Sequence, residues 1–227
     1  IIGLDDDTYV HDITVRNCRF DGVKSGNSIT GKTRDIKFDN LFLNGSLVLQ
    51  TPPYKNYSQW MTYSEMKRTP QSYMLDFSKR PKWSYVMGIE LESMLDTYLR
   101  YGDKRIWDYC QEYTDTMIND NGDIRGFKYK DYNLDNIRTG HFVARMYQQN
   151  PEAKNLKAMQ TMMRQLKEQP RTIEDGVFWH KAIYSYQVWL DGIFMGLPYN
   201  VLTASIIFKP KEAKKIYDDA VDQVKTT

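Results

Sequence analysis

Hydrophobic and polar residues alternate in two short segments near the start of the chain, and the two segments match each other. Each segment alternates apolar with polar positions, which is typical of strands that bury one face. The second segment follows the first by 23 residues. Five pairs of residues match at this spacing: Asp12 and Asp35, Ile13 and Ile36, Asn17 and Asn40, Phe20 and Leu43, and Gly22 and Gly45.

A fixed period of this length indicates β-coils stacked on one another. In such a stack, Asn17 and Asn40 would lie one coil apart, where side-chain amides can hydrogen-bond at a bend. Two coils cannot bury a core of their own, because coil repeats need about three or more copies. We therefore interpret residues 1–49 as the last coils of a longer stack. Two unrelated β-hairpins are the alternative.

The pattern changes at residues 50–56, where Pro52 and Pro53 stand in a polar stretch. Two prolines end any strand or helix, so we expect a linker here. Beyond it, apolar residues recur with helical spacing. The spacing predicts helices over residues 57–67, 83–101, 104–118, 134–149, 152–169 and 211–224, with a further helix near 190–197 that Pro198 interrupts before it resumes toward 207.

The predicted helices alternate in character. Those at 83–101, 134–149 and 190–207 are apolar or aromatic around much of their circumference, whereas the others carry one clear polar face. Helical hairpins that place one helix inside and one outside form an α/α toroid. We therefore predict a mainly α fold, a partial α/α barrel over residues 57–227. An irregular helical bundle is the alternative.

Composition narrows the range of partners. Lys and Arg number 31 against 29 Asp and Glu, so the net charge of +2 gives no electrostatic reason to expect a nucleic acid. We find no apolar run that approaches the ~18–20 residues of a membrane helix, and so expect no membrane partner. Two cysteines exclude a disulfide scaffold, and three histidines without helical spacing favour no metal site. The chain has no Gly-rich phosphate loop, and we expect no cofactor.

Polar and aromatic residues gather at the N-terminal entries of the three apolar helices. These candidate site residues are Trp83, Tyr85, Asp135, Asn136, His141, His180, Tyr186, Trp189 and Asp191. If the three entries open onto one end of a toroid, these side chains meet. Aromatic faces beside carboxylates are typical of sugar sites. The alternatives are aromatic residues that belong to the core, and histidines that serve the structure.

Two aspartates are the candidates for acid–base chemistry. Asp135 stands where it can cap its helix, and Asp191 stands in Trp-Leu-Asp-Gly among apolar neighbours. An apolar setting favours the protonated form of a carboxyl, which is the condition for a general acid near neutral pH. A plain helix-capping role is the alternative for both aspartates.

Four motifs carry a resemblance to a known family. They are Lys-Trp-Ser-Tyr-Val-Met-Gly-Ile-Glu at 82–90, Asn-Leu-Asp-Asn-Ile-Arg-Thr-Gly-His at 133–141, Trp-His-Lys at 179–181, and Gln-Val-Trp-Leu-Asp-Gly-Ile-Phe-Met-Gly-Leu-Pro at 187–198. The region from residue 57 resembles the unsaturated rhamnogalacturonyl hydrolases of glycoside hydrolase family 105, which are related to family 88. The first 49 residues resemble the last coils of the right-handed β-helix of family 28 polygalacturonases.

The resemblance implies a six-hairpin α/α barrel without metal or cofactor. The substrate would be a pectin-derived oligosaccharide that carries a 4,5-unsaturated uronic acid at its non-reducing end. Asp191 would protonate C4 and help water add at C5, while Asp135 would lie beside it. The resemblance also implies substrate contacts from the remaining candidates, namely Trp83, Tyr85, Trp189, His180, Tyr186, Asn136 and His141.

Length is where the chain departs from the family. A full barrel needs twelve helices and seven are predicted, so we expect residues 57–227 to be the N-terminal half of a barrel, and we allow that this part is inactive alone. An inverting glycosidase with Asp135 as base and Asp191 as acid, and a non-catalytic sugar-binding fragment, are the alternatives. The family favours a periplasmic or secreted bacterial protein over a cytoplasmic one. We draw no expectation for the oligomeric state.

Overall fold

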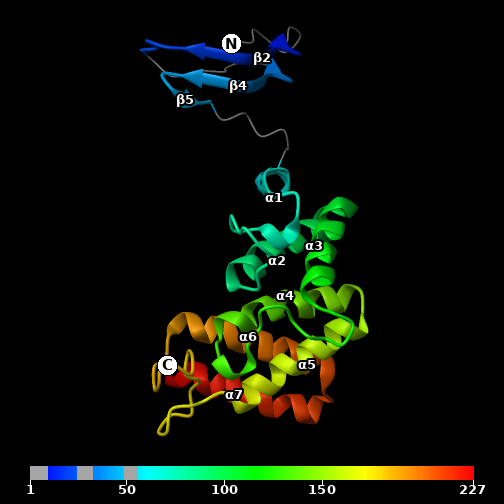
Figure 1. The fold of residues 1–227 in the computed structure, drawn as a ribbon, viewed down its shortest axis with the longest axis vertical. Coiled ribbons are helices and arrows are strands. Elements are labelled where there is room, and N and C mark those ends of the chain that lie inside the picture. Colours follow the sequence, from blue (N-terminus) through cyan, green and yellow to red (C-terminus); the bar gives the residue numbers. More distant parts are fainter. Residues whose placement is uncertain (1–9, 25–32, 49–55) are drawn as a thin grey trace. The chain divides into compact units, whose positions relative to one another are not determined.

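A computed structural model describes residues 10–24, 33–48 and 56–227 of the 227-residue chain. The chain divides into two compact units, Ile1–Met61 and Thr62–Thr227. Figure 1 shows strands in the first unit and helices from α1 onward. The linker expected at 50–56 lies outside the described residues except for Asn56, and the domain bounds at 49 and 57 stay predictions.

The first unit contains parallel strands that pair at an offset of 23 residues. Strand β1 (Val10–His11) pairs with β3 (Thr33–Arg34), and β2 (Thr14–Phe20) pairs with β4 (Lys37–Leu43). A short β5 (Ser46–Leu47) runs antiparallel to β4. Parallel pairing across a complete repeat is incompatible with two independent hairpins, because hairpin strands are antiparallel.

The predicted contact between the two asparagines is confirmed. Asn40 Nδ2 donates a hydrogen bond of 2.9 Å to Asn17 Oδ1. Both residues have a left-handed backbone, with φ of 53° for Asn17 and 54° for Asn40. Asparagine tolerates this conformation better than other non-glycine residues, and this explains its recurrence at the bend. The wider assignment to a β-helix stays a prediction.

The helical part confirms a mainly α architecture. The described residues hold seven α-helices, and each corresponds to a predicted one. They are α1 (Tyr57–Arg68), α2 (Tyr85–Tyr101), α3 (Lys104–Met117), α4 (Asp135–Gln149), α5 (Ala153–Glu168), α6 (Leu190–Ile207) and α7 (Pro210–Thr226). Two short 3₁₀ helices, η1 (Ser72–Met74) and η2 (Tyr129–Asp131), lie in the connections.

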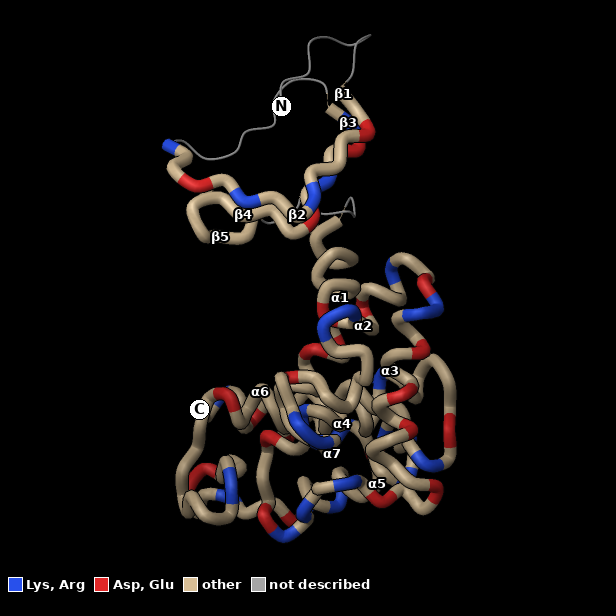
Figure 2. Tube along the Cα trace, turned by 45° about the horizontal axis from the view of Figure 1, so that its top comes forward, with Lys and Arg blue, Asp and Glu red and all other residues tan. Residues whose placement is uncertain are grey.

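Helix α4 is the most enclosed element of this unit. It packs between α2 and α6, while α3, α5 and α7 pack outside α2, α4 and α6 respectively (Figure 1). This agrees with the predicted alternation of inner and outer helices. Eight residues of α4 are buried, among them Thr139 and Gly140. Charged positions of both signs are interspersed along the helical unit, as Figure 2 shows, in keeping with the small net charge.

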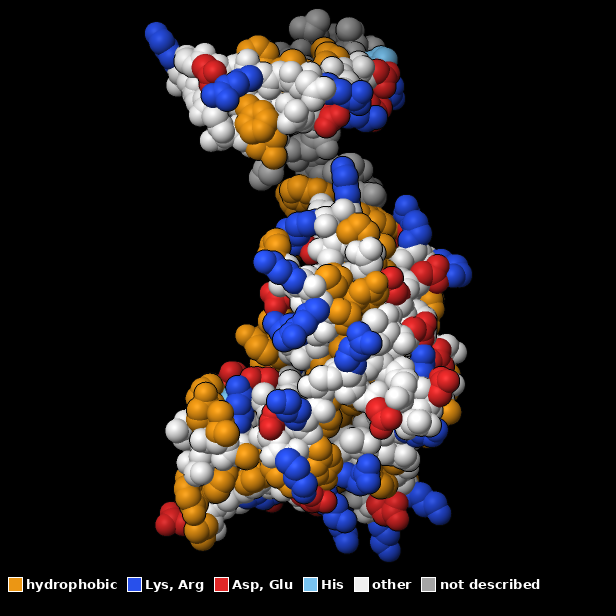
Figure 3. Space-filling model, in the orientation of Figure 1, with side chains coloured by type: hydrophobic (Ala, Val, Ile, Leu, Met, Phe, Trp, Pro, Cys, Tyr) orange, Lys and Arg blue, Asp and Glu red, His pale blue; other side chains and the backbone are white. Residues whose placement is uncertain are grey.

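Helix α6 keeps an apolar side exposed although it is one of the inner helices. Leu190 is 78% exposed and Phe194, one turn later, is 50% exposed. Figure 3 shows hydrophobic side chains at the surface of the helical unit, between the charged ones. Among the described residues, the guanidinium of Arg138 on α4 lies 5.0 Å from the centroid of the Phe194 ring and covers part of this side.

Glycines allow the inner helices to approach closely. A Cβ atom on Gly88 of α2 would lie 2.6 Å from the Cα atom of Thr139 on α4. On the other side of α4, a Cβ on Gly140 would lie 2.9 Å from Tyr199 of α6. Real Cβ atoms do not tolerate such distances to backbone or ring atoms. The spacing of α2, α4 and α6 therefore depends on positions that carry no side chain.

The expected interruption of α6 is wrong. The helix runs without a break from Leu190 to Ile207 and includes Pro198. Proline removes one backbone donor, but packing against α4 and α7 outweighs that loss. The expectation that no apolar segment reaches membrane length is also wrong by length and composition, since α6 has 18 residues with a mean hydropathy of 1.3. With 44% of it buried, it also fits a core helix.

The close approach of α2 and α4 predicts the effect of Gly88→Ala. The added methyl group meets backbone atoms of Thr139, so the two helices must separate. We expect a loss of about 1–3 kcal/mol in the free energy of unfolding, although alanine is the better helix former. Denaturant unfolding followed by circular dichroism measures this loss.

Ser93→Ala is the matched control on the same helix. Ser93 is exposed, and its hydroxyl donates only to the carbonyl of Glu90 one turn earlier. We expect its unfolding free energy to stay within about 0.5 kcal/mol of the parent. Equal midpoints for Gly88→Ala and Ser93→Ala would contradict the close-packing argument.

Candidate active site

Two aspartates and a histidine from distant parts of the chain meet at the N-terminal ends of α4 and α6. Asp135 is the first residue of α4, and Asp191 is the second residue of α6. His180 comes from the connection between α5 and α6. Its Nε2 lies 3.4 Å from Asp135 Oδ1, and its Nδ1 lies 4.0 Å from Asp191 Oδ1. The cluster of Asp135, His180 and Asp191, here called the carboxylate–imidazole cluster, joins two of the three predicted groups.

Backbone hydrogen bonds hold the connection against the start of α4. Leu134 N donates to His180 O at 3.1 Å, and Ala182 N donates to Asp131 O at 3.1 Å. On the other side, a Cβ atom on Gly192 would lie 2.7 Å from His180 Nδ1. Gly192 therefore allows the imidazole to lie directly on the first turn of α6. The position of His180 is fixed from both helices.

Burial controls the protonation of His180. Its side chain is only 1% exposed. Burial lowers the pKa of His180, the charges of Asp135 and Asp191 oppose that shift, and the charge of Lys181 adds to it. The pKa of His180 lies below its ordinary value, so the imidazole is neutral at pH 7. A neutral imidazole can donate one hydrogen bond and accept another, but adds no positive charge to the cluster.

Lys181 is a site residue that sequence reasoning missed. Its Nζ lies 2.7 Å from Asp135 Oδ2, with side chains 21% and 17% exposed. This ion pair holds the Asp135 side chain in one orientation. Lys181 stands next to His180 in the Trp-His-Lys motif, but only the folded loop brings it to the start of α4. One indication of this role was present in the sequence: Lys181 directly follows His180, a predicted site residue.

Asp191 is more exposed than its sequence setting predicts. Its side chain is 55% exposed, because Trp189 and Leu190 beside it are themselves exposed at the start of α6. The apolar enclosure expected from the sequence is therefore not provided by the described residues. The polar neighbour of Asp191 in this structure is His180, whose Nδ1 lies 4.0 Å from Asp191 Oδ1.

Aromatic rings form a stacked wall over His180. The ring of Trp189 stacks on the imidazole at 4.3 Å between centroids with 10° between planes, and Tyr184 stacks on Trp189 at 5.1 Å. Trp189 is 39% exposed, so part of its face is open to a ligand. Tyr186 packs on Trp179 at 4.7 Å and is also exposed. Tyr184 is a second residue that the sequence interpretation did not include.

Trp83 and Asn136, two of the predicted site residues, form a hydrogen bond with each other. Trp83 is buried, stacks on Tyr113, and donates from Nε1 to the carbonyl of Asn136 at 2.8 Å. With Trp83 6% exposed, little of its ring is open to a ligand in this structure, and its expected role as a stacking surface for sugar stays a prediction. Its hydrogen bond ties the entry of α2 to the first turn of α4. Tyr85, two residues later, is 40% exposed.

His141 lies in a separate group of charges between α2 and α4. Its Nδ1 is 3.0 Å from Glu92 Oε1, and Glu92 also pairs with Arg138 and Arg145. Burial alone would raise the pKa of Glu92, but the hydrogen bond from His141 and the charges of His141 and Arg138 lower it to about 2. His141 stands six residues beyond Asp135, about 9 Å along the helix. The structure thus places His141 away from the carboxylate–imidazole cluster.

The cluster has a donor set suited to a metal ion. One ligand atom each from Asp135, His180 and Asp191 lies within 4.8 Å of the others. Lys181 already supplies a positive charge to Asp135. The expectation of no metal, drawn from the spacing of the three histidines and from the resemblance, stays a prediction.

Comparison with known proteins identifies the family. The model for Glycosyl Hydrolase Family 88 matches residues 57–227, which is most of the chain. The chain belongs to glycosyl hydrolase family 88. The family 88 chain is also similar to a solved structure of a glycoside hydrolase from family 105 of C. acetobutylicum ATCC 824, with 29% identity and a TM-score of 0.64. The match covers 74% of this chain and 44% of that one, so the family 88 chain spans less than half of its relative.

The electrostatics of the site predict a shift in the titration of His180. In Lys181→Gln the cation that lowers the pKa of His180 is lost, while the carboxylates that raise it remain. We expect His180 to titrate at a higher pH than in the parent. NMR of the histidine rings measures this, since the chain has only His11, His141 and His180.

Two comparisons complete that experiment. His11→Gln and His141→Gln assign the ring signals, and Lys128→Gln removes a charge from an exposed position that is not part of the cluster. Lys128→Gln should leave the titration of His180 unchanged. A lower or equal pKa of His180 in Lys181→Gln would contradict the arrangement.

Proposed function

We propose that the protein to which this chain belongs hydrolyses unsaturated uronyl oligosaccharides of the rhamnogalacturonan class. The observation that carries the proposal is the pair of carboxylates, Asp135 and Asp191, gathered around a buried neutral His180 beside an exposed tryptophan face. Membership in family 88 and the family 105 relative support glycosidic hydrolysis in general. The motifs at 133–141 and 187–198 favour the unsaturated substrate.

The proposed reaction begins with protonation of the C4=C5 double bond. Asp191 delivers a proton to C4, and the positive charge that develops at C5 is shared with the ring oxygen. Asp191, now a carboxylate, takes a proton from a water molecule that adds to C5. The resulting hemiketal opens by cleavage of the C5–O5 bond to give a ketone at C5. The hemiacetal left at C1 then releases the second sugar as an alcohol, and one water molecule is consumed overall.

The other residues of the site have supporting roles in this scheme. Asp135, held by Lys181, is positioned to accept hydrogen bonds from sugar hydroxyls. His180 contributes a neutral polar contact, and the open face of Trp189 offers a stacking surface for the sugar ring. Tyr85 and Tyr186 are exposed aromatic residues near the entries of α2 and α6 and complete the proposed binding set.

The separation of the carboxylates disfavours an inverting glycosidase. Oxygen atoms of Asp135 and Asp191 approach within 4.8 Å. Inverting enzymes keep their carboxyl groups roughly 6.5–9.5 Å apart to admit a water molecule between acid and sugar. The spacing is closer to the ~5 Å of retaining enzymes. A test with saturated oligosaccharides therefore distinguishes hydration from direct displacement at the anomeric carbon.

The domain assignment is part of the same proposal. Residues 57–227 would form the N-terminal half of an α/α barrel, which is supported by the 44% coverage of the family 105 relative. Residues 1–49 would be the last coils of a polygalacturonase-like β-helix, supported by the parallel pairing at a 23-residue offset. Both parts would then act on pectin-derived material.

The proposed role of Asp191 predicts the effect of Asp191→Asn. An amide cannot donate the proton to C4, so we expect hydration to fall at least about a hundredfold. The fold should be unaffected, because the side chain is 55% exposed. Loss of alkene absorbance from a lyase-made unsaturated disaccharide measures the rate, in the longest protein that contains these residues.

Asp222→Asn is the control, since Asp222 is exposed on α7 and makes no side-chain contact with the cluster. Asp222→Asn should keep full activity. Treatment of the unmodified enzyme with a chelator should also leave the activity unchanged, because no metal is expected in the reaction. Full activity of Asp191→Asn would contradict the assignment of Asp191 as the proton donor. Cleavage of saturated oligosaccharides at a similar rate would instead favour the glycosidase alternative.

A further inference from the structure

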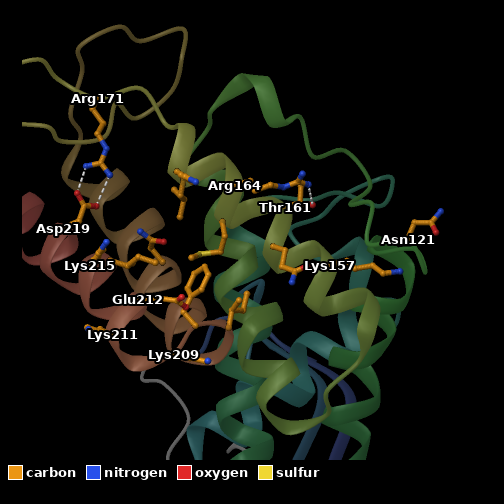
Figure 4. Close-up of a pocket in the computed structure, with 18 residues that line it drawn as sticks. Asn121, Lys157, Thr161, Arg164, Arg171, Lys209, Lys211, Glu212, Lys215 and Asp219 are labelled. Atoms are coloured by element: carbon orange, nitrogen blue, oxygen red, sulfur yellow. Dashed lines mark hydrogen bonds and ion pairs between the residues drawn. The ribbon is translucent and has the colours of Figure 1, made fainter.

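A large groove lies on the helical unit among α5, α6 and α7, outside the carboxylate–imidazole cluster. Its volume is about 1350 Å³. Figure 4 shows Arg164 and Thr161 on the α5 side and Lys211, Glu212 and Lys215 on the α7 side. Asn200 of α6 also lines it, nine residues beyond Asp191 and so about 13 Å farther along that helix. The groove is therefore a separate site from the candidate active site.

Positive charge is concentrated at this groove. Seven Lys and Arg residues line it against two carboxylates, Glu212 and Asp219. Arg171 is neutralised, because it forms two hydrogen bonds with Asp219 at 2.6 and 2.9 Å. The whole chain has a net charge of only +2, so the remainder of the chain is net negative. A local surplus of this size is an electrostatic signal for an anionic ligand.

Most of these cations are not committed to other partners. Among the described residues, Lys167, Lys209, Lys211 and Lys215 form no ion pair. By contrast Lys214, on the same helix as Lys211 and Lys215 but outside the groove, pairs with Asp218. Four unpaired ammonium groups thus line the groove, while Lys214 lies outside it in an ion pair.

The interior of the groove combines apolar surface with a polar anchor. Met163, Leu166, Ile207 and Phe208 supply the apolar part of the lining. Asn200 is 7% exposed, and its side-chain amide makes no hydrogen bond within the part of the chain that the structure describes. Its amide atoms keep contact with solvent, so a ligand in the groove can reach them and take the place of water. Asn200 therefore marks the floor of the groove as a place for a hydrogen-bonding ligand.

We propose that this groove binds a uronic-acid oligosaccharide, the same chemical class as the proposed substrate, at a second site away from the aspartates. Carboxylates would meet the lysines, hydroxyls would reach the Asn200 amide, and the apolar faces of the sugar rings would cover the apolar lining. An acidic amphipathic helix fits less well, because its apolar face would leave the Asn200 amide unsatisfied. The ligand class rests on the proposed function, whereas the location and the charge do not.

The direct test measures binding of a saturated galacturonate tetramer, which has no double bond to hydrate. Calorimetric titration of the 227-residue chain at two salt concentrations gives the dissociation constant. We expect affinity to fall with added salt, and a neutral galactose tetramer to bind much more weakly. In Lys211→Gln/Lys215→Gln we expect an affinity for the galacturonate roughly tenfold lower, since two charge contacts are lost.

The matched control is Lys214→Gln/Lys225→Gln, which removes the same charge from α7 outside the groove. It should change the affinity by less than about twofold. Asn200→Leu should weaken binding of the tetramer but not of an acidic amphipathic peptide. Should Asn200→Leu fail to fold, the lysine pair still decides the outcome.

The outcomes separate this inference from the proposed function. Equal affinity in Lys211→Gln/Lys215→Gln and the parent would overturn the groove as a binding site, even where the alkene disaccharide is hydrated. Tighter binding of the acidic peptide than of the tetramer would also overturn it. If binding depends on Lys211 and Lys215 but the alkene disaccharide is not hydrated, the groove is a binding site and the proposed hydration reaction is contradicted.

Discussion

The contact of α4 with its two neighbouring helices is the constraint on which the rest of the helical unit depends. Gly88 on α2 lies against the backbone of α4, and Gly140 on α4 lies against the Tyr199 ring of α6, so neither position leaves room for a side chain. Helices that pack this closely have fixed N-terminal ends. Because Asp135 and Asp191 stand at those ends, backbone packing sets where the two side chains start, and the Lys181 side chain then orients Asp135.

The buried imidazole of His180 lies between the two aspartates that this packing brings together. His180 fills the space between α4 and α6 and remains neutral because burial outweighs the attraction of two carboxylates. Lys181 forms an ion pair with Asp135, whereas no Lys or Arg of the described residues forms an ion pair with Asp191. Two aspartates with the same side chain thus receive different surroundings. Such a difference is what an acid and a positioning carboxylate require.

Periodic features could be predicted from the sequence, and contacts between distant loops could not. The seven helices follow from apolar spacing, and the bond between Asn17 and Asn40 follows from the 23-residue repeat. Pro198 was misleading because a local rule about proline was overridden by tertiary packing of α6. No local rule indicates that the Lys181 side chain reaches across to the start of α4. The sequence did not indicate that Trp83 is buried or that His141 pairs with Glu92, because an aromatic ring or an imidazole at a helix entry can line a site or serve the core. Burial, which decides both cases, is a property of the complete packing arrangement.

The left-handed residues of the strand unit bear on where this part of the chain tolerates change in length. Asp12 and Asn17, and then Asp35 and Asn40, take up this conformation at matching places in the two 23-residue repeats. One residue inserted between such a pair would turn every following side chain to the opposite face of its strand and part the two amides. The interval from aspartate to asparagine within each repeat therefore behaves as a unit of fixed length.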